Sequence, residues 1–448
     1  MPGRNIVGPV PAEGIHMRTI TIVAILVCAA AAAAAAQESR PAGGEPFYLG
    51  EMVIEAAPPP DEAEAILDRP EHTTVISREK FEDKFTTLPE VLAEQAGVEI
   101  KSYGGFGNFS TVSIRGVSSN KVSILMDGVP LNLGLGGAVN IGDLPLRNLE
   151  RIEVYRGQAP ARFGVSSIGG VVNLVTRRTE GEVRGDVTVS AGSFGARSAD
   201  VFARSGTGRL DYSLSLLTQR SEGDFEFLND LGTPYNPNDD FYQARRNNWF
   251  RDFHFVANAD YDLGRGRTLS LGDRFSRKKQ GLPGPSNNQS FFSKLTTVNH
   301  IFNFSYSDPA AIGDNTAAEI EFRWHANESR FIDLVGNSGE IGLDREDNRN
   351  VTKKMSIDTS FTSYFGLNHE LFSSVVYAKE RYQPWDRLEP LEQFLRSRRR
   401  SWTAKAEYRF SSDDDRFLGT AAAGREWVES TMPGDNPGYN WNPDPANT

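Results

Sequence analysis

The sequence has almost no cysteine: Cys28 is the single one among 448 residues, and it lies in a leader-like segment. If that leader is removed, no thiol remains, which excludes disulfides and cysteine metal sites. The six histidines are scattered and none pairs with another at ligand spacing, so we expect no zinc site. A broad basic face is also missing, because the net charge is -11 and the pI is about 5.2. We therefore expect no nucleic-acid partner.

The motifs of common enzymes are missing as well. The glycine-rich stretch 103–107 is not a GxGxxG or Walker pattern that opens a helix, and no G-x-S-x-G elbow appears. We interpret Asp127, Glu150 and Glu153 as ordinary carboxylates of a turn and of strand surfaces. The sequence therefore predicts no catalytic residues, no enzyme and no cofactor. The mean hydropathy of -0.43 excludes a helical membrane bundle but allows a membrane barrel, whose strands alternate polar and apolar residues.

Residues 1–36 resemble a leader with a signal peptide. Met17 and Arg18 precede an apolar run over residues 20–36, which is too short for a comfortable membrane span. The run ends in three alanines before the polar Gln37, which is a typical cleavage pattern. We expect translation to begin at Met17 and the mature chain to begin near Gln37.

Residues 37–72 are rich in proline, alanine, glycine and acids, which predicts a flexible linker. The linker contains one island of strand-forming residues, made of Glu51, Met52, Val53, Ile54, Glu55, Ala56 and Ala57. One interpretation is a segment that adds a strand to the sheet edge of a partner. The other is that this island is only the least polar part of the linker.

Residues 73–180 predict a compact α+β domain of ordinary size. Short apolar runs that end in glycine or turn residues predict strands. These runs are residues 73–76, 98–100, 112–114, 122–126, 152–155 and 171–175. Thr87 is suited to cap a helix that begins at Leu88, and Gly97 ends it.

Residues 181–448 change to strict alternation, which predicts long strands. For example, Ile320, Phe322 and Trp324 alternate with charged neighbours such as Arg323. A lipid-facing barrel shows this pattern, but a soluble sandwich alternates equally well. The loop lengths decide between them, because short and long links alternate down the chain as in an outer-membrane barrel. The short links are residues 206–209, 263–267, 366–369 and 411–415, and the long ones are 221–247, 277–293, 330–349 and 380–396.

The number of strands predicts that the chain is a fragment. We count about eleven strands, whereas a closed barrel of this type needs an even number. Twelve strands would enclose a radius of about 12 Å, and twenty-two strands about 22 Å. A domain of residues 73–180 has a radius of gyration of about 13 Å and fits only the larger barrel. We therefore predict a transmembrane antiparallel β-barrel of about 22 strands when complete, about half of which is present here, with an N-terminal α+β plug domain.

Four motifs of residues 73–180 resemble, in order and spacing, the plug of TonB-dependent outer-membrane receptors of Gram-negative cells. The motif residues are Arg115 and Gly116; Asp127 and Gly128; Glu150, Arg151, Glu153, Arg156 and Gly157; and Gly169, Gly170 and Asn173. The sequence has Gln158 where the family often has proline. The resemblance covers about residues 73–179 and the remainder more loosely.

The resemblance implies energy-coupled uptake of a scarce, large solute, such as a ferric siderophore or cobalamin, across the cell outer membrane. It makes Glu51–Ala57 similar to a TonB box, which the TonB energy-coupling protein of the inner membrane pulls. The implied partners are TonB, outer-membrane lipid and lipopolysaccharide, and an iron chelate or cobalamin. A passive plugged porin would explain the strands but not the compact domain or the island. A surface signalling receptor would need a further folded domain, for which residues 37–70 are too short and too polar.

Position within the plug motif points to candidate ligand-facing residues in two turns. They are Tyr103, Phe106, Asn108 and Phe109 in the first turn, and Asn132, Leu133 and Leu135 in the second. The alternative is that both turns are glycine-rich and pack against the barrel wall. Loop 222–240 has enough oxygens for Ca²⁺, although acid-rich loops are usually solvated. A basic group could meet a phosphate of the outer leaflet or form a solvated loop; it consists of Arg396, Arg398, Arg399 and Arg400.

Overall fold

The computed structural model describes most of the chain after the leader and linker. The described residues are 73–84, 86–102, 107–133, 138–157, 163, 169–177, 183–233, 235–335, 340–341, 344–366, 368–388, 396–412 and 418–431. The predicted signal peptide, the linker and the island Glu51–Ala57 lie outside them. A helix long and apolar enough to cross a membrane does not occur in these described ranges.

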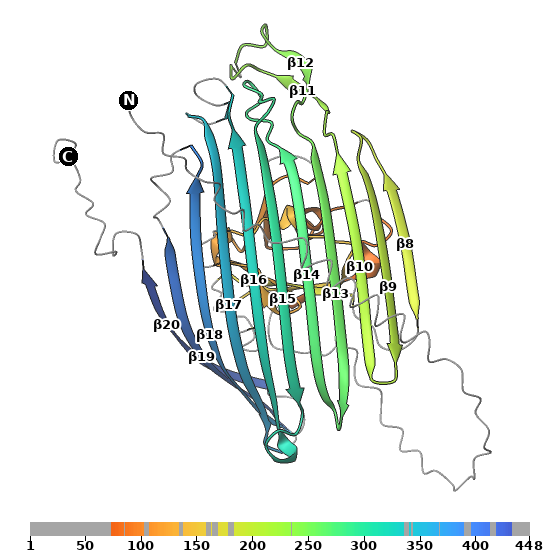
Figure 1. The fold of residues 1–448 in the computed structure, drawn as a ribbon, viewed down its shortest axis with the longest axis vertical. Coiled ribbons are helices and arrows are strands. Elements are labelled where there is room, and N and C mark those ends of the chain that lie inside the picture. Colours follow the sequence, from red (N-terminus) through yellow and green to blue (C-terminus); the bar gives the residue numbers. More distant parts are fainter. Residues whose placement is uncertain are drawn as a thin grey trace, which may run out of the picture. The chain divides into compact units, whose positions relative to one another are not determined.

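The residues from Thr73 to Arg177 form one unit, which we call the small domain (orange to yellow in Figure 1). Five strands form its main sheet in the order β1-β6-β7-β4-β5: β1 (Thr73–Ser77), β4 (Ser123–Met126), β5 (Val129–Pro130), β6 (Leu149–Tyr155) and β7 (Val171–Thr176). A second sheet pairs β2 (Val98–Ser102) with β3 (Ser110–Ile114). The helical segments are α3 (Leu88–Ala93), η1 (Arg78–Lys80), η2 (Ser119–Lys121) and η3 (Ile141–Asp143). The predicted α+β domain and its strands are confirmed.

The apolar runs of the small domain meet in one core. Leu92, Ile114 and Ile152 are fully buried there, as the periodicity of their segments requires. The helix α3 begins where the sequence predicts it, because Thr87 forms a capping box. Its hydroxyl accepts a hydrogen bond from the Glu90 N–H at 3.4 Å, and the Glu90 carboxylate accepts one from the Thr87 N–H at 2.9 Å.

The rest of the described chain forms an eleven-stranded antiparallel sheet, which we call the wall (Figure 1). Its strands, in spatial order, are β8 (Arg184–Ala191), β9 (Arg197–Thr207), β10 (Leu210–Ser221), β13 (Phe250–Gly264), β14 (Arg267–Gly281), β15 (Lys294–Asp308), β16 (Thr316–Asp333), β17 (Glu346–Tyr364), β18 (His369–Asp386), β19 (Ser397–Ser411) and β20 (Leu418–Thr431). The predicted count of about eleven strands is confirmed. A separate hairpin of β11 (Glu226–Asn229) and β12 (Phe241–Ala244) lies in the link between β10 and β13, and the short turn η5 (Gly313–Asn315) precedes β16.

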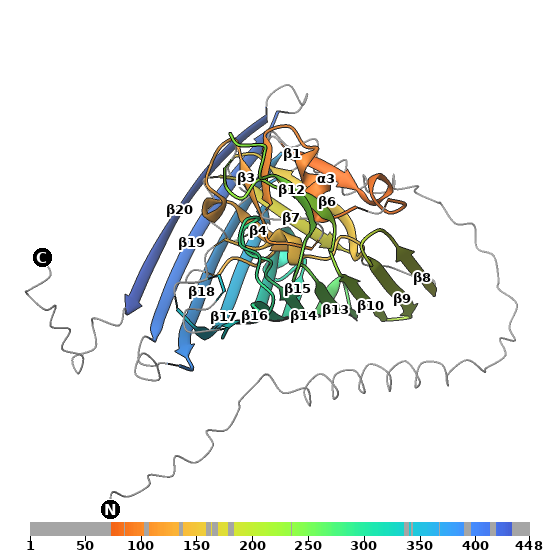
Figure 2. The ribbon, with the colours of Figure 1, turned by 90° about the horizontal axis from the view of Figure 1, so that it is seen from above.

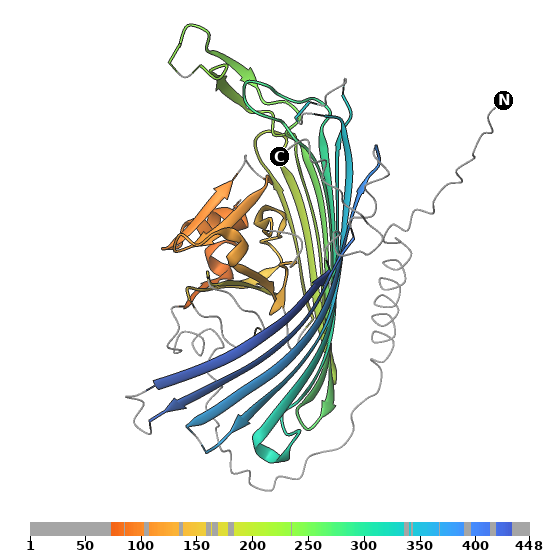
Figure 3. The ribbon, with the colours of Figure 1, turned by 90° about the vertical axis from the view of Figure 1, so that its left-hand side faces the viewer.

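The wall curves, and the small domain lies on its concave side (Figures 2 and 3). The alternation seen in the sequence sorts side chains between the two faces of the wall. On β16, Arg323 and His325 line a cavity against the small domain, whereas Ile320 on the opposite face is 49% exposed. Apolar side chains thus cover the convex face and polar ones face inward, as a lipid-facing wall requires.

Short and long links alternate between neighbouring wall strands. Gly208 and Arg209 alone separate the ends of β9 and β10, whereas residues 282–293 separate β14 from β15. The long links lie at one end of the wall, together with the β11–β12 hairpin (Figure 1). The loop pattern used to choose a barrel over a sandwich is therefore present in the structure.

Candidate functional site between the small domain and the wall

Asp127 and Arg274 join the small domain to the wall. Asp127 occupies the turn between β4 and β5 with a positive φ of 50°. Its carboxylate accepts hydrogen bonds from the N–H and the hydroxyl of Thr176, both at 2.7 Å. Arg274 of β14 forms an ion pair with the same carboxylate, and the side chains of Arg274 and Asp127 are only 5% and 3% exposed. Arg274 also donates to the Asn303 side-chain oxygen at 2.7 Å, so its guanidinium is held from both sides.

Lys278 makes a second connection four residues further along β14, on the same face of the strand. Its ammonium contacts the Gly107 carbonyl and forms an ion pair with Asp143 at 2.5 Å. The Lys278 side chain is 4% exposed, and its nitrogen lies 5.4 Å from the centre of the Phe250 ring. Two buried cations of one wall strand therefore hold two acids of the small domain.

Uncharged groups extend this contact over neighbouring strands. The Asn108 amide donates to Asn248 at 3.2 Å, and the Ser215 hydroxyl donates to Asn148 at 2.8 Å. Near β8, the Arg177 guanidinium pairs with the Asp186 carboxylate at 2.5 Å. Asn108 was a candidate ligand residue, and the structure gives its side chain this contact with the wall.

Several plug-motif residues maintain the interior of the small domain. Glu153 is 2% exposed, and its carboxylate accepts hydrogen bonds from Arg151, Tyr155 and Asn173 at 2.8, 3.0 and 2.9 Å. Asn173 in turn accepts the Gly128 N–H at 3.0 Å. Asp127 lies in a turn and has partners, as expected, whereas Glu153 lies in the interior and not on a strand surface. Both carboxylates are covered, and both have charged or multiple hydrogen-bond partners, as burial demands.

Other plug-motif residues shape turns. Arg115 and Gly116 form a turn with positive φ values of 51° and 75°. Arg156 donates to the Ala96 carbonyl at 2.8 Å and to the Thr74 hydroxyl at 2.6 Å, which ties two segments to the end of β6. Gly170 has φ 113°, and a Cβ atom there would lie 2.4 Å from the Tyr155 carbonyl oxygen. The two other motif glycines, Gly157 and Gly169, lie on either side of a stretch that is mostly outside the described residues, and Glu150 is exposed.

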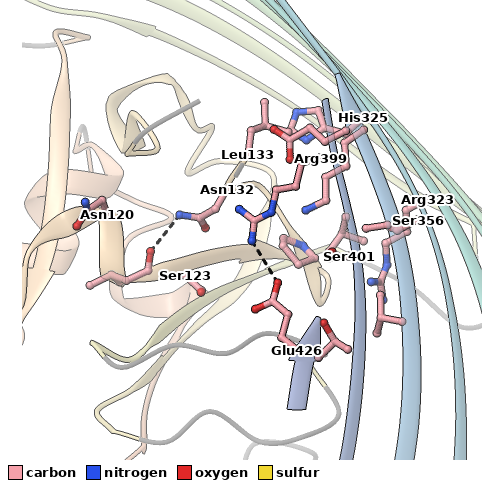
Figure 4. A pocket seen from close by; sticks show the side chains of 18 of the residues that line it. Asn120, Ser123, Asn132, Leu133, Arg323, His325, Ser356, Arg399, Ser401 and Glu426 are labelled. Atoms are coloured by element: carbon pink, nitrogen blue, oxygen red, sulfur yellow. Dashed lines mark hydrogen bonds and ion pairs between the residues drawn. The ribbon is translucent and has the colours of Figure 1, made fainter. Parts of the chain in front are cut away.

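Two cavities lie between the small domain and the wall. The first, which we call the polar cavity, has a volume of about 530 Å³ (Figure 4). Its charged and histidine lining consists of Lys121, Arg323, His325, Lys354, Glu380, Arg399 and Glu426. The second, the apolar cavity, has a volume of about 320 Å³. Its apolar lining includes Phe109, Met126, Leu131, Leu144, Phe255, Phe275, Leu295 and Ile301.

The charges of the polar cavity are only partly neutralised by each other. Arg399 and Glu426 form an ion pair at 3.2 Å, which Figure 4 shows as a dashed line. Arg323 lies 3.6 Å from the Asp358 carboxylate and also pairs with a neighbouring acid on β16. Lys354 lies opposite Glu380 of the neighbouring strand, and the buried Nδ1 atom of His325 has no hydrogen-bond partner among the described residues. The lining thus has more cationic side chains than carboxylates.

The structure brings together some of the predicted ligand residues. Leu133 lines both cavities, Asn132 lines the polar one and Phe109 the apolar one, whereas Tyr103, Phe106 and Leu135 lie outside the described residues. The Asn132 amide is already used by the small domain, since it accepts the Ile124 N–H at 2.7 Å and donates to the Val122 carbonyl at 3.1 Å.

Sequence reasoning missed most of the wall side of both cavities. It named Arg399, but as a possible contact to a phosphate of the outer leaflet and not as a cavity residue. The signal that could have found it is a charged or histidine residue at an inward position of several consecutive strands. Such residues are Arg323 and His325 on β16, Lys354 on β17, Glu380 on β18 and Arg399 on β19. Each of these residues stands at a polar position of an alternating strand. The sequence of one strand does not show which residue of the next strand lies beside it.

The loop candidates have partners within the protein. In loop 222–240, Asp230 accepts the Gly232 N–H at 3.0 Å and Asp239 accepts the Thr233 hydroxyl at 3.0 Å. No group of three or more histidine, cysteine, aspartate or glutamate residues that could hold a metal ion occurs among the described residues. The basic group does not form a loop, because Arg398, Arg399 and Arg400 lie in β19. Arg399 pairs with Glu426, and Arg400 pairs with an acid of β20 at 3.8 Å.

Glu340 connects two long loops at the end of the wall. Its carboxylate accepts three successive backbone N–H groups, those of Phe291, Phe292 and Ser293, at 3.0, 2.8 and 3.1 Å. Partial burial acts to raise the pKa of Glu340, but the donors at Phe292, Phe291 and Ser293 outweigh it and lower the pKa from the ordinary 4.5. The loops after β14 and β16 are thus held together by one ionised carboxylate.

Comparison with known proteins agrees with this architecture. Residues 65–171 match the family described as TonB-dependent receptor plug domain. A segment of 129 residues is 36% identical to the vitamin B12 transporter BtuB of Vibrio vulnificus, covering 29% of this chain and 21% of that protein. A segment of 144 residues is 33% identical to the vitamin B12 transporter BtuB of Vibrio cholerae, covering 28% and 23%.

Solved receptor structures share the fold over a longer stretch. The ferric enterobactin receptor of Pseudomonas aeruginosa superposes with a TM-score of 0.63 at 16% identity, covering 82% of this chain and 58% of that one. The ferric yersiniabactin uptake receptor of Yersinia pestis gives a TM-score of 0.58 at 16% identity, covering 80% and 61%. The chain thus matches less than two thirds of the length of these relatives.

The plug-family match, the eleven-stranded wall and the position of the small domain on its concave side define a plugged receptor fold. Residues 65–171 match the plug domain of TonB-dependent receptors, and the described chain shares the fold of solved outer-membrane receptors of that type. The small domain is its plug, and we use that name from here on. The related proteins that these comparisons name are transporters and receptors, which agrees with the expectation that this chain is not an enzyme.

Proposed function

We propose that this receptor carries out energy-coupled uptake of a scarce, large solute, such as a ferric siderophore or cobalamin, across the outer membrane. The observation that supports this most directly is the pair of buried ion pairs, Arg274 with Asp127 and Lys278 with Asp143. Separating one partner of a buried ion pair costs about 3–5 kcal/mol. A plug held in this way blocks passive flow and needs an external source of energy to move.

The energy would reach the plug through the segment Glu51–Ala57. Its strand-forming residues suit a segment that pairs with the sheet edge of TonB, the proposed partner at the inner membrane. In this proposal residues 1–36 are the leader, 37–72 the linker with this segment, 73–180 the plug and 181–448 the barrel part. Lipid and lipopolysaccharide would contact the convex face of the wall.

The solute classes come from the relatives, whose names include a vitamin B12 transporter and a ferric enterobactin receptor. Phe109 and Leu133 are the candidate plug residues whose apolar side chains line a cavity. They are therefore the better candidates for contact with a solute. Competitive binding with cobalamin and a small panel of ferric chelates would separate the classes.

Deletion of Glu51–Ala57 tests the proposal. We expect the deletion to abolish uptake of the radiolabelled solute by intact cells while binding to isolated outer membranes stays unchanged. The matched control deletes the next seven residues, Pro58–Glu64, which lie in the same linker and have no strand pattern. Uptake that survives the first deletion would contradict energy coupling and favour a passive plugged porin.

A further inference from the structure

Three ionisable side chains that line the apolar cavity are already paired within the protein. Arg274 and Asp143 both line it, but each forms a buried ion pair, with Asp127 and Lys278 respectively. His254 also lines it and contacts the Asp252 carboxylate at 2.6 Å. What remains for a solute is mainly the aromatic and aliphatic surface around Phe109, which favours an apolar group.

The polar cavity has the opposite character. Its lining has four cationic side chains, Lys121, Arg323, Lys354 and Arg399, against two carboxylates, Glu380 and Glu426. Lys354 lies opposite Glu380 of β18, and the Nδ1 atom of His325 is buried without a hydrogen bond to a described residue. The Nε atom of Arg323 is likewise buried without a partner there. This excess of cations over carboxylates favours an anion, because the protein interior screens charge less than water does.

The two cavities meet at Leu133 of the plug and His325 of β16, since both residues line both cavities. Leu133 is 9% exposed and His325 is 6% exposed, so neither is a flexible surface group. A solute that occupies both cavities would therefore place its apolar part on one side of this junction and its charged part on the other.

We propose that the two cavities form one two-chamber site for an amphiphilic anion. The apolar body lies in the apolar cavity beside Phe109, and a carboxylate- or sulfonate-like head lies in the polar cavity against Lys354 and His325. Volumes of about 530 and 320 Å³ are in the range of small-molecule sites. The inference rests on the proposed function, because it names the solute chemistry that the space between plug and wall accepts.

Calorimetry on the protein in lipid nanodiscs tests the site with a defined probe, naphthalene-2-sulfonate. Two comparison compounds separate the contributions: naphthalene-2-sulfonamide keeps the ring without the charge, and inorganic sulfate keeps the charge without the ring. We expect the sulfonate to bind at least about tenfold more tightly than either compound. Titration of empty nanodiscs with the same probe removes the part that comes from partition into lipid.

Two pairs of variants locate the site. Lys354→Met removes a cation of the polar cavity, and its control, Lys353→Met, removes a neighbouring lysine that is exposed on the opposite face of β17. Thr297→Trp fills the apolar cavity from β15, and its control, Thr296→Trp, points to the other face. We expect the first variant of each pair to weaken sulfonate binding at least about tenfold and its control to leave it unchanged.

The proposal is overturned if the sulfonate does not bind, if it binds no better than the sulfonamide, or if Lys354→Met and Lys353→Met bind it equally. Lys354→Met keeps the test valid should Thr297→Trp fail to fold. Deletion of Glu51–Ala57 should leave probe binding intact, because occupation of a cavity needs no energy coupling. If the probe does not bind but the deletion abolishes uptake, this inference is removed and the proposed function stands. If the probe binds but uptake survives the deletion, the proposed function is removed and the site stands.

Discussion

Arg274 of β14 forms a buried ion pair with Asp127 of the plug, although 147 positions separate the two residues in the sequence. The carboxylate also accepts both polar hydrogens of Thr176, so the turn after β4, the end of β7 and the wall are joined at one point. Movement of the plug away from β14 has to break this arrangement first.

Arg274→Met should loosen the plug turn more than the double variant Arg274→Met/Asp127→Asn. The single change leaves a buried carboxylate without its cation and costs about 3–5 kcal/mol, whereas the double change removes both charges. Hydrogen exchange at the Thr176 N–H, which donates to Asp127, measures the effect, and we expect it to speed up at least about 100-fold in the single variant.

Arg277→Met is the matched control for that experiment, because Arg277 lies on the same strand but is exposed. Its exchange at Thr176 should equal that of the unaltered protein. Equal effects of Arg274→Met and Arg277→Met would show that the ion pair does not hold the plug.

Gly107→Ala should destabilise the contact between the first ligand-candidate turn and the wall. A Cβ atom at Gly107 would lie 2.5 Å from the Phe250 ring, and φ there is 78°. Gly208→Ala is the control, since Gly208 has φ 62° but open space around its Cβ position. Both variants carry the backbone strain of about 1 kcal/mol, and only Gly107→Ala adds about 1–3 kcal/mol of overpacking. The two variants are compared by the resistance of the plug to protease in isolated membranes. Equal resistance of both variants would contradict the close packing at Gly107.

Asn132→Ala should act on plug stability rather than on solute recognition. The substitution leaves the Ile124 N–H and the Val122 carbonyl without their partner, which costs about 1–3 kcal/mol. Asn120→Ala, an exposed residue of the same cavity, is the control. We expect hydrogen exchange at the Ile124 N–H to be faster in Asn132→Ala and unchanged in Asn120→Ala. Loss of solute affinity without any change in exchange would restore Asn132 as a direct ligand residue.

Glu340→Gln should release the loop after β14 and remove the pH dependence of hydrogen exchange in that loop. The folded state lowers the pKa of Glu340, so its contribution is complete above the ordinary value of 4.5 and is lost as the pH falls through the lowered value. Because Glu340 is only partly buried, we expect a modest effect of about tenfold on exchange at the Phe292 and Ser293 N–H groups. Exchange corrected for intrinsic rates should be fast at low pH in the unaltered protein and fast at all pH values in the variant.

Glu222→Gln serves as the control for the loop experiment, since the Glu222 side chain is exposed in another long loop and forms no hydrogen bond with a described residue. It should keep the protection of Phe292 near neutral pH and its loss in acid. If Glu340→Gln also keeps the protection near neutral pH and loses it in acid, the three N–H groups are protected by the loop itself and not by the carboxylate.

The sequence by itself determined the features that depend on neighbours in the chain. Alternation around Ile320 and Arg323 predicts a strand with one lipid-facing side, because side chains of a strand point to opposite faces in turn. The capping residue Thr87 marks the start of α3, since the first N–H groups of a helix need acceptors nearby. The order of the plug motifs identified the domain, because each motif is a short stretch of neighbouring residues that forms a turn.

Only the tertiary structure decided which of these residues meet. Nothing in the strand around Lys354 predicts that His325 of β16 and Leu133 of the plug border the same space, because register and curvature place them together. The burial of Asp127 and Glu153 was likewise invisible in sequence, since a carboxylate in a turn or strand looks the same whether water or an arginine covers it. Local pattern sets the faces and turns of this protein, and long-range packing sets its cavities and ion pairs.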